Sequence, residues 1–218
     1  MPRLALLNPN ANPQTTDMMR AIAQETAPDM SIQGITAGTG PLIIETGAAL
    51  AASVSDVLGS ALALAGFDGV IVSAFGDPGV TQLQEMLSIP VIGIGAASAR
   101  AAARDGGRFG VVTTTPGLVP GIDALMRAHA GTATYAGTVL TEGDAVPLMA
   151  DPDRLNEALL CAIHHAVLVG MDRVIIGGGP LGRAAERLRA RSPVPLINPV
   201  RAAVLEMTDR LNRIGTPA

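Results

Sequence analysis

The chain has little of what several classes of protein need. Its 218 residues include one Cys, no Trp, one Tyr and three Phe, and only 16% of them are charged. Fifteen Lys plus Arg against nineteen Asp plus Glu leave a net charge of -4. An acidic chain with so few aromatic rings lacks both the cations that neutralise phosphates and the rings that stack on bases. We therefore expect no nucleic-acid partner.

The single cysteine and the short apolar runs also bear on location. Cys161 cannot form an intramolecular disulfide by itself, which fits a reducing compartment. The first apolar run, 4–7, is far shorter than the core of a signal peptide. Asp56 and Asp68 interrupt the later Ala/Leu/Val-rich region before it could span a bilayer. These features predict a cytoplasmic protein with no membrane partner.

The chain is rich in hydrophobic residues, and strand-like segments alternate with helix-like segments along it. Hydrophobic residues make up 48% of it, which excludes a disordered protein and permits one large domain or two smaller ones. Short β-branched runs alternate with longer Ala-rich segments of helical period, which is typical of an α/β fold with parallel sheets. We expect strands at 4–8, 32–35, 69–73, 91–94, 109–113, 137–140, 174–176 and 195–197.

The two halves of the chain repeat each other. "RLALLNPN" from Arg3 aligns with "RFGVVTTT" from Arg108 at an offset of 105, and "FDGVIVSAFGDPG" from Phe67 aligns with "MDRVIIGGGPLG" from Met171 at an offset of 104. "PVIG" and "PLIN" follow in the same order. The repeat predicts a duplicated α/β unit: two pseudo-symmetric, Rossmann-like lobes, each with a parallel four-stranded sheet.

Local signals divide the chain further. The charged, Gly-rich "RDGGR" at 104–108 predicts a boundary, so that 1–105 plus 201–218 form the first lobe and 106–200 the second, with a last helix near 201–213 packing back on the first lobe. Asn12 before a proline and Asp151 before another proline each predict the start of a helix.

The loops after the strands predict where a ligand binds. In parallel sheets ligands bind beyond the carboxyl ends of strands, and Gly-rich turns there aim N–H groups at a carboxylate or an enolate oxygen. The alternative is that glycine and proline only make tight turns. Because the loops recur in both halves, we expect one shared cleft. Its predicted binding residues are Asn10, Ser73, Ala74, Phe75, Gly76, Thr114, Thr115, Gly178 and Gly179.

Cofactor and metal signals are poor. "GGGPLG" at 177–182 has the spacing of a dinucleotide loop, but Pro180 removes an N–H and no acidic residue ends the next strand. His129, His164 and His165 lie inside predicted helices without an acidic partner at metal spacing. We expect no cofactor and no metal.

Three further side chains could carry chemistry. Cys161 is expected to be a half-buried structural thiol, because nothing basic is placed to lower its pKa. Glu45 in "GPLIIETG" and Asp77 in "GDPG" are better placed as proton carriers. Capping of the following helix is the alternative role for Asp77, and it stays open.

The ordered set of motifs resembles a known superfamily. "LLNPNAN", "GPLIIETG", "DGVIVSAFGDPG", "IPVIGIGAAS", "FGVVTTTP", "RVIIGGGPLG" and "VPLINPVRAAV" are similar to segments of the Asp/Glu racemase superfamily, and within it of the hydantoin and allantoin racemases. The resemblance covers nearly the whole chain. It implies two pseudo-symmetric α/β lobes with the site between them.

The resemblance also exposes a difference. Racemases of this superfamily carry one catalytic cysteine per lobe, in motifs similar to "CFGDPG" and "GCAG", and these positions are Ala74 and Gly178 here. Inverting a carbon centre requires one group to remove a proton and another to deliver one on the opposite face. A two-thiol mechanism therefore does not carry over, although an arylmalonate decarboxylase of the superfamily keeps only the second-lobe cysteine.

Together these features predict an isomerase of the racemase kind. It would act on a small cyclic amide, such as a hydantoin, or on an α-substituted carboxylate, without the two cysteines. The alternatives are a non-catalytic binding protein derived from the fold, a ring-opening hydrolase and a decarboxylase. The uncharged, Ala- and Met-rich composition predicts a homo-oligomer.

Overall fold

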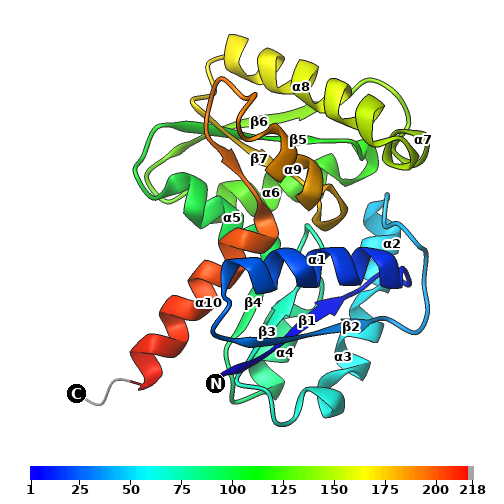
Figure 1. Ribbon diagram of the computed structural model, residues 1–218, viewed down its shortest axis with the longest axis vertical. Helices are drawn as coiled ribbons and strands as arrows, with labels where there is room; N and C mark the ends of the chain where they lie inside the picture. Colours follow the sequence, from blue (N-terminus) through cyan, green and yellow to red (C-terminus); the bar gives the residue numbers. More distant parts are fainter. Residues whose placement is uncertain (216–218) are drawn as a thin grey trace.

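The computed structural model describes residues 1–215 and consists of two stacked α/β lobes (Figure 1). The strands are β1 (Arg3–Asn8), β2 (Ser31–Thr36), β3 (Gly69–Val72) and β4 (Val91–Gly93) in the first lobe, and β5 (Arg108–Thr113), β6 (Thr134–Leu140), β7 (Arg173–Ile176) and β8 (Leu196–Ile197) in the second. Both sheets are parallel, with orders β2-β1-β3-β4 and β6-β5-β7-β8. The second lobe therefore repeats the topology of the first, as the sequence repeat predicts.

All eight predicted strands are present, and β6 differs most from its predicted bounds. It begins at Thr134, three residues before the predicted start. Its first residues pair with Arg108 and Phe109, and the register then shifts before Val111. Gly137, with φ +111°, lies at this irregularity. The strand therefore continues across a bulge, which its sequence alternation does not reveal.

The helices connect the strands and cover both faces of each sheet. They are α1 (Pro13–Thr26), α2 (Gly47–Ala52), α3 (Val54–Gly59), α4 (Val80–Met86), α5 (Ile94–Ala103), α6 (Val119–His129), α7 (Ala145–Ala150), α8 (Pro152–Leu168), α9 (Gly182–Leu188) and α10 (Pro199–Gly215), with short 3-10 turns η1 (Ala61–Leu64), η2 (Pro116–Leu118) and η3 (Gly179–Leu181). The two predicted caps are confirmed. Asn12 and Asp151 each accept two N–H groups of the first helical turn.

The core consists of three clusters separated by the sheets. On β1, Leu4 and Leu6 face a central cluster, whereas Ala5 and Leu7 face a cluster beneath α3 and α4. Such alternation is the period-2 pattern of a strand covered on both faces. The central cluster also includes Phe109 and other residues of the second lobe. Both lobes therefore contribute to the central cluster.

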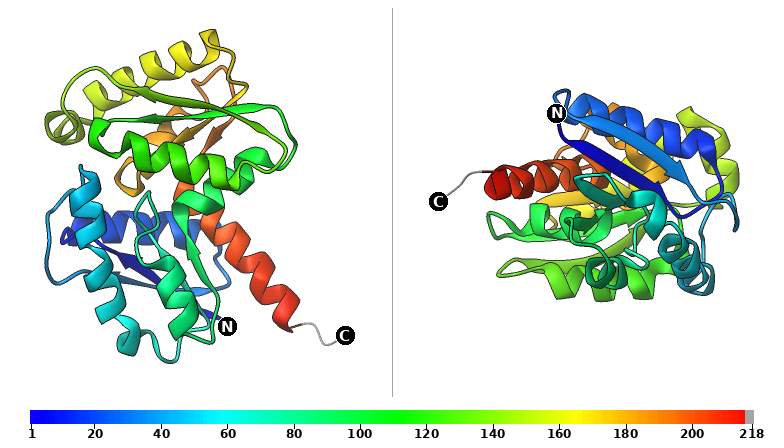
Figure 2. Two further views of the ribbon diagram at one scale, coloured as in Figure 1. Left: turned by 180° about the vertical axis from the view of Figure 1, so that it is seen from behind. Right: turned by 90° about the horizontal axis from the view of Figure 1, so that it is seen from below.

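Helices α5 and α10 lie where the two lobes meet. Helix α10 packs against α1, α5 and β3, and its far end projects beside the first lobe (Figures 1 and 2). Helix α5 also contacts α6 and β7 of the second lobe. The division into 1–105 plus 201–218 and 106–200 stays a prediction, and 216–218 lie outside the described residues.

Helix α8 buries one face and exposes the other. Its apolar stripe is buried, and His164 and His165 are exposed. Cys161 is exposed as well, so the prediction of a half-buried thiol is wrong. It lies one turn from Glu157 and from His165, both exposed, which places it on the outer surface of the helix. Within residues 1–215, no helix is long and apolar enough to cross a membrane.

Candidate functional site

A small cavity lies between the lobes, at the carboxyl ends of the two central strands of each sheet. β1 and β3 carry one side of it, and β5 and β7 carry the other. Strand order reverses between β1 and β3 and again between β5 and β7, and such switch points are where parallel sheets bind ligands. The cavity volume is about 50 Å³, room for roughly four water molecules. This size suits a small ligand.

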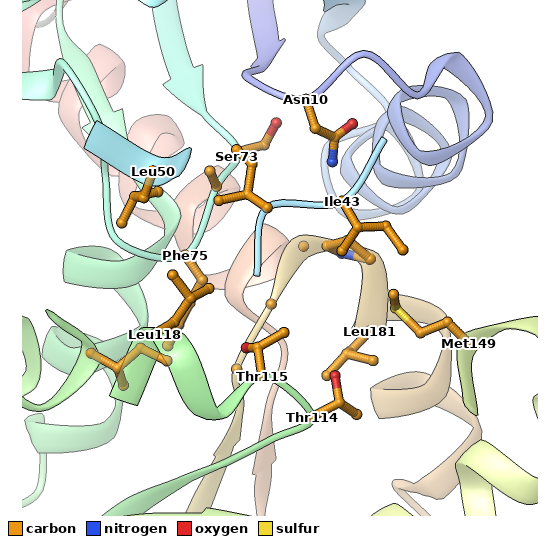
Figure 3. Close-up of a pocket in the computed structure, with 17 residues that line it drawn as sticks. Asn10, Ile43, Leu50, Ser73, Phe75, Thr114, Thr115, Leu118, Met149 and Leu181 are labelled. Atoms are coloured by element: carbon orange, nitrogen blue, oxygen red, sulfur yellow. The ribbon is translucent and has the colours of Figure 1, made fainter. Parts of the chain in front are cut away.

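The cavity brings together most of the predicted binding residues (Figure 3). Those that line it are Asn10, Ser73, Ala74, Phe75, Thr114, Thr115, Gly178 and Gly179. Gly76 does not line it: this glycine has φ +140°, and a side chain there would meet Leu50. The two lobes thus contribute one polar loop and one Gly-rich loop each.

The rest of the lining is apolar and was not singled out from the sequence. These residues are Ile43, Ile44, Leu50, Leu118, Ile122, Met149, Gly177, Pro180 and Leu181. Two of these residues, Ile44 and Met149, follow the corresponding edge strands of the two sheets, β2 and β6. They lie 105 residues apart, so the repeat itself was a signal that could have found Met149.

Two side-chain polar groups face the cavity without a protein partner. The Oδ1 atom of Asn10 accepts from Asn8 Nδ2 at 2.8 Å and from the N–H of Asn12 at 3.0 Å. These bonds orient the amide so that its Nδ2 points into the cavity (Figure 3). The Thr114 hydroxyl makes no hydrogen bond to any residue among 1–215 and also lines the cavity. Asn10 thus presents a donor to the cavity, and Thr114 a donor or an acceptor.

Ser73 and Thr115 use their hydroxyls differently. Ser73 Oγ donates to the carbonyl of Leu7 at 2.8 Å, which ties the end of β3 to β1. Thr113 Oγ1 donates to the carbonyl of Gly177 at 2.9 Å, and the Thr115 hydroxyl lies 3.1 Å from Thr113 Oγ1. These contacts hold the loops in place. Each hydroxyl oxygen keeps acceptor capacity, and binding of a ligand by Ser73 and Thr115 stays a prediction.

Main-chain N–H groups supply the remaining polarity. Those of Ala74, Phe75, Gly178 and Gly179 donate to no other residue that the structure describes. They come from two loops, one in each lobe. Unpaired N–H groups beside a small apolar cavity are suited to bind a carboxylate, a carbonyl or the enolate oxygen formed from it.

The two Gly-rich loops touch at Gly179. A Cβ added there would meet the Met19 sulfur and lie 2.9 Å from the carbonyl oxygen of Ser73. We expect Gly179→Ala to destabilise the protein by about 2 kcal/mol, because the backbone of the opposite loop cannot yield like a side chain. Gly121→Ala is the control: no atom lies within 4 Å, and removing a glycine from helix α6 should stabilise by about 0.5 kcal/mol. Urea unfolding measures both, and equal effects would contradict the close contact.

Asp77 lies behind the cavity and not in its lining. Its two carboxylate oxygens accept from the N–H groups of Gly95 and Ala96, each at 2.7 Å. It therefore caps α5, the helix after β4, and the expected cap on the following helix α4 is wrong, since Gly79 takes that position. Asp77 has φ +53°, which turns its side chain toward α5. Whether it also carries a proton stays a prediction.

The ionisation of Asp77 gives a pH-dependent test. Burial raises its pKa to about 6, from an ordinary value of 3.8, although the two N–H donors and Arg100 act in the opposite direction. A raised folded-state pKa means that the carboxyl favours folding most below about 3.8 and that this contribution is lost as pH rises through about 6. We expect the stability of the wild type relative to Asp77→Asn to fall between these pH values and to be flat outside them.

Urea midpoints from pH 3.5 to 7.5 check this, with Asp151→Asn as the matched control. Asp151 caps α8 through the single atom Oδ1, and asparagine caps as well as aspartate, so this variant should differ from the wild type by less than about 0.5 kcal/mol. Parallel curves for wild type and Asp77→Asn would refute the raised pKa.

Glu45 also lies outside the cavity lining, although its neighbours Ile43 and Ile44 form part of the wall. Its backbone carbonyl packs against Gly117, at the start of the turn after β5. Its catalytic role stays a prediction. Among the described residues that line the cavity, none has a side chain that titrates in the ordinary pH range, and this lack of an acid or base is the main chemical feature of the site.

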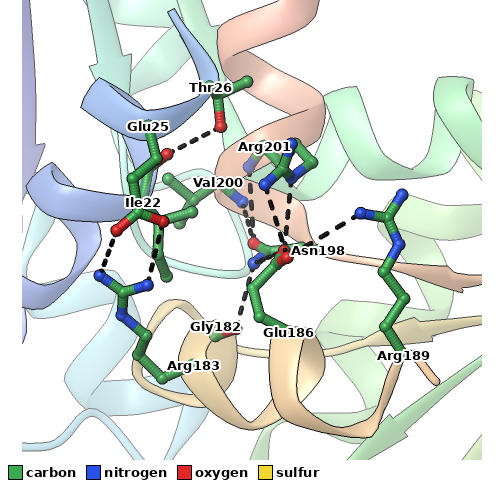
Figure 4. A network of polar contacts seen from close by, with 10 residues as sticks. All are labelled: Ile22, Glu25, Thr26, Gly182, Arg183, Glu186, Arg189, Asn198, Val200 and Arg201. Carbon is green, nitrogen blue, oxygen red and sulfur yellow. Dashed lines mark hydrogen bonds and ion pairs between the residues drawn. The ribbon is translucent and has the colours of Figure 1, made fainter. Parts of the chain in front are cut away.

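Polar contacts outside the cavity join the two lobes and support the second Gly-rich loop (Figure 4). Arg183, one residue after the Gly-rich loop, forms a two-pronged ion pair with Glu25 of α1 at 2.8 and 3.0 Å. The Arg183 guanidinium lowers the pKa of Glu25. Asn198 Nδ2 donates to the carbonyl of Gly182 and to Glu186. These contacts fix the start of α9, and with it the loop that carries Gly178 and Gly179.

No metal site accompanies this cavity. Within the part of the chain that the structure describes, no three His, Cys, Asp or Glu side chains gather closely enough to hold a metal ion. His129 contacts Arg100, with Nδ1 3.3 Å from the guanidinium, and lies away from the cavity.

Known proteins share this architecture. An allantoin racemase from Klebsiella pneumoniae superposes with a TM-score of 0.90 at 26% identity, covering 98% of this chain and 89% of that one. One from Pseudomonas fluorescens gives a TM-score of 0.88 at 28% identity, over 98% and 92%. A glutamate racemase from Bacillus anthracis, at 18% identity and a TM-score of 0.69 over 98% and 83%, shows the fold alone.

Sequence comparison agrees. A hydantoin racemase from Rhizobium meliloti is 30% identical over 201 residues, which span 88% of this chain and 83% of the relative. Another, from Paenarthrobacter aurescens, is 26% identical over 92% of this chain and 87% of the relative. The family model for Asp/Glu/hydantoin racemases matches residues 4–207. The chain therefore belongs to the Asp/Glu/hydantoin racemase family, with the α/β fold of two parallel four-stranded sheets that its repeat predicts.

Proposed function

We propose that the chain is a racemase-like isomerase of a small cyclic amide, such as a hydantoin, or of an α-substituted carboxylate. Membership of the family and the relatives named hydantoin racemase support this class of reaction. The observation that carries the proposal is the set of unpaired N–H groups that the two Gly-rich loops present to one small cavity.

These donors favour formation of an enolate. As the α C–H bond breaks, its electron pair moves into the ring carbonyl, and the negative charge collects on the oxygen. N–H groups of Ala74, Phe75, Gly178 and Gly179 stabilise that charge, which lowers the barrier to proton removal. Asn10 Nδ2 and the Thr114 hydroxyl bind the other polar atoms of the ligand and orient it.

Asp77 and Glu45 lie outside the cavity lining, so in this proposal bound water carries the proton within the cavity, and a role for either carboxylate stays a prediction. Ala74 and Gly178, where the family resemblance places cysteines, supply no acid or base. One bound water takes the proton from one face and becomes hydronium, while a second delivers a proton to the other face and becomes hydroxide. Proton exchange through solvent then restores both waters, so that the net change is inversion. We infer a slow reaction, because general acid–base catalysis by positioned side chains contributes typically 10²–10⁴-fold.

A binding protein without turnover is the second candidate. The absence of a titratable side chain from the described cavity lining favours it. Such a protein would keep the donors and the apolar wall and would hold its ligand unchanged.

One experiment separates the two. Single enantiomers of hydantoins, allantoin, aspartate and glutamate are incubated with the protein in deuterated water, and NMR follows the α-proton. The isomerase exchanges that proton and inverts the centre. Saturable thermal stabilisation by a ligand that never exchanges supports the binding protein, and neither effect with any ligand rejects both candidates.

A further inference from the structure

The side chains that line the cavity limit which substituent a bound ligand can carry on its α-carbon. Most of these side chains are apolar, and none of those that the structure describes carries a charge. A charged or strongly polar substituent would lose its hydration here without gaining a partner. The polar groups that do face the cavity, Asn10 and Thr114, belong to the loops after β1 and β5, where the ring or carboxylate binds in the proposed function.

The apolar side chains of Ile43 and Met149 line the cavity and are only half-buried. Ile43 lies in the segment after β2, and Met149 in helix α7 after β6, which are equivalent places in the two lobes. In Figure 3 they lie on the same side of the cavity, away from Leu50 and Phe75. A substituent that points to this side would pack between them.

We propose that Ile43 and Met149 are specificity-determining residues and that they select ligands with a compact, uncharged apolar substituent. The inference rests on the proposed function and narrows its substrate class. It departs from the substrate named for the allantoin racemases of the same fold, because the ureido group of allantoin is polar and would meet an apolar wall. It also disfavours aspartate and glutamate, whose second carboxylate would have no cation beside it.

Calorimetry with five ligands tests the proposal: 5-methylhydantoin, 5-isobutylhydantoin, 5-benzylhydantoin, hydantoin-5-acetate and allantoin. We expect the wild type to bind the isobutyl compound at least roughly tenfold more tightly than allantoin or the acetate, the scale on which apolar pockets discriminate. Met149→Ala and Ile43→Ala should each weaken isobutyl binding roughly tenfold and leave benzyl binding equal or tighter, because they remove packing and open the cavity.

Val146→Ala is the matched control. Val146 is on the same short helix as Met149, is 51% exposed and does not line the cavity, so its substitution should change no affinity. Equal binding of allantoin, the acetate and the isobutyl compound would overturn the proposal, as would equal effects of Met149→Ala and Val146→Ala. Failure of the wild type to bind any hydantoin is a different outcome: it overturns the proposed function and this inference with it.

Discussion

Cysteines placed together at Ala74 and Gly178 should raise the rate at which a hydantoin centre is inverted at least a hundredfold over the wild type. The family resemblance places a thiol at each position, one for each face of the inverted carbon. Both positions line the cavity beside the unpaired N–H donors. Adding a positioned acid and base to an existing enolate site should contribute the lower end of the usual 10²–10⁴-fold gain.

Geometry permits the second cysteine at some cost. A Cβ at Gly178 would have its nearest heavy atom, Leu181 Cγ, at 3.6 Å, so there is room. The backbone has φ +134°, which L side chains rarely adopt, and we expect a loss of about 1–3 kcal/mol of stability. Rates are therefore compared at a temperature where unfolding curves show every variant folded.

The controls isolate the thiols. Ala74→Cys and Gly178→Cys alone should give little gain, because inversion needs a group on each face. Serines at both positions match the cysteines in shape but are far weaker acids, and should also stay near the wild-type rate. A double-cysteine variant no faster than the double-serine variant would show that the cavity does not hold a hydantoin with its α-carbon between these positions.

The second large effect is expected for Asn10→Asp. The substitution keeps an Oδ1 that can accept from Asn8 and Asn12, so the loop after β1 retains its hydrogen bonds. It replaces the Nδ2 donor, which faces the cavity, by a carboxylate oxygen (Figure 3). A donor thus becomes a negative acceptor opposite a carbonyl or carboxylate of the ligand. We expect affinity to fall by about a hundredfold, about 2.7 kcal/mol.

Thr114→Val provides a graded comparison for Asn10→Asp. It removes one hydroxyl from the cavity at nearly constant shape and should weaken binding about tenfold. Calorimetry measures both affinities, and thermal unfolding checks that each variant folds like the wild type. Similar affinities for Asn10→Asp and the wild type would mean that the Asn10 amide does not touch the ligand.

The fold was predictable because the two halves of the chain repeat the same pattern of strands and loops. Each strand run ends in a loop whose counterpart lies 104 or 105 residues away, and the sheets that result have the same strand order. The polar side of the cavity was predictable for the same reason, since ligands bind at the ends of the central strands. Asn10, Thr114 and Gly178 are examples.

The remaining features depend on contacts that no local pattern encodes. Asp77 precedes helix α4 in the chain but caps α5, because its φ of +53° turns the carboxylate toward the neighbouring connection. Met149 looks like an ordinary core residue of a short helix until the two lobes face each other. Cys161 differs from these two, because the helix phase of α8 is itself a local pattern and places this side chain on the outer surface.

In the proposed function, this family member acts on its ligand without cysteine. Cys161 is the chain's one cysteine and lies exposed on α8, outside the cavity between the lobes. The most direct measurement is therefore the rate at which the thiol-free variant Cys161→Ser exchanges the α-proton of 5-isobutylhydantoin in deuterated water. We predict the same rate as the wild type, above that of protein-free buffer. Loss of exchange in this variant would show that Cys161 takes part, and would contradict the account.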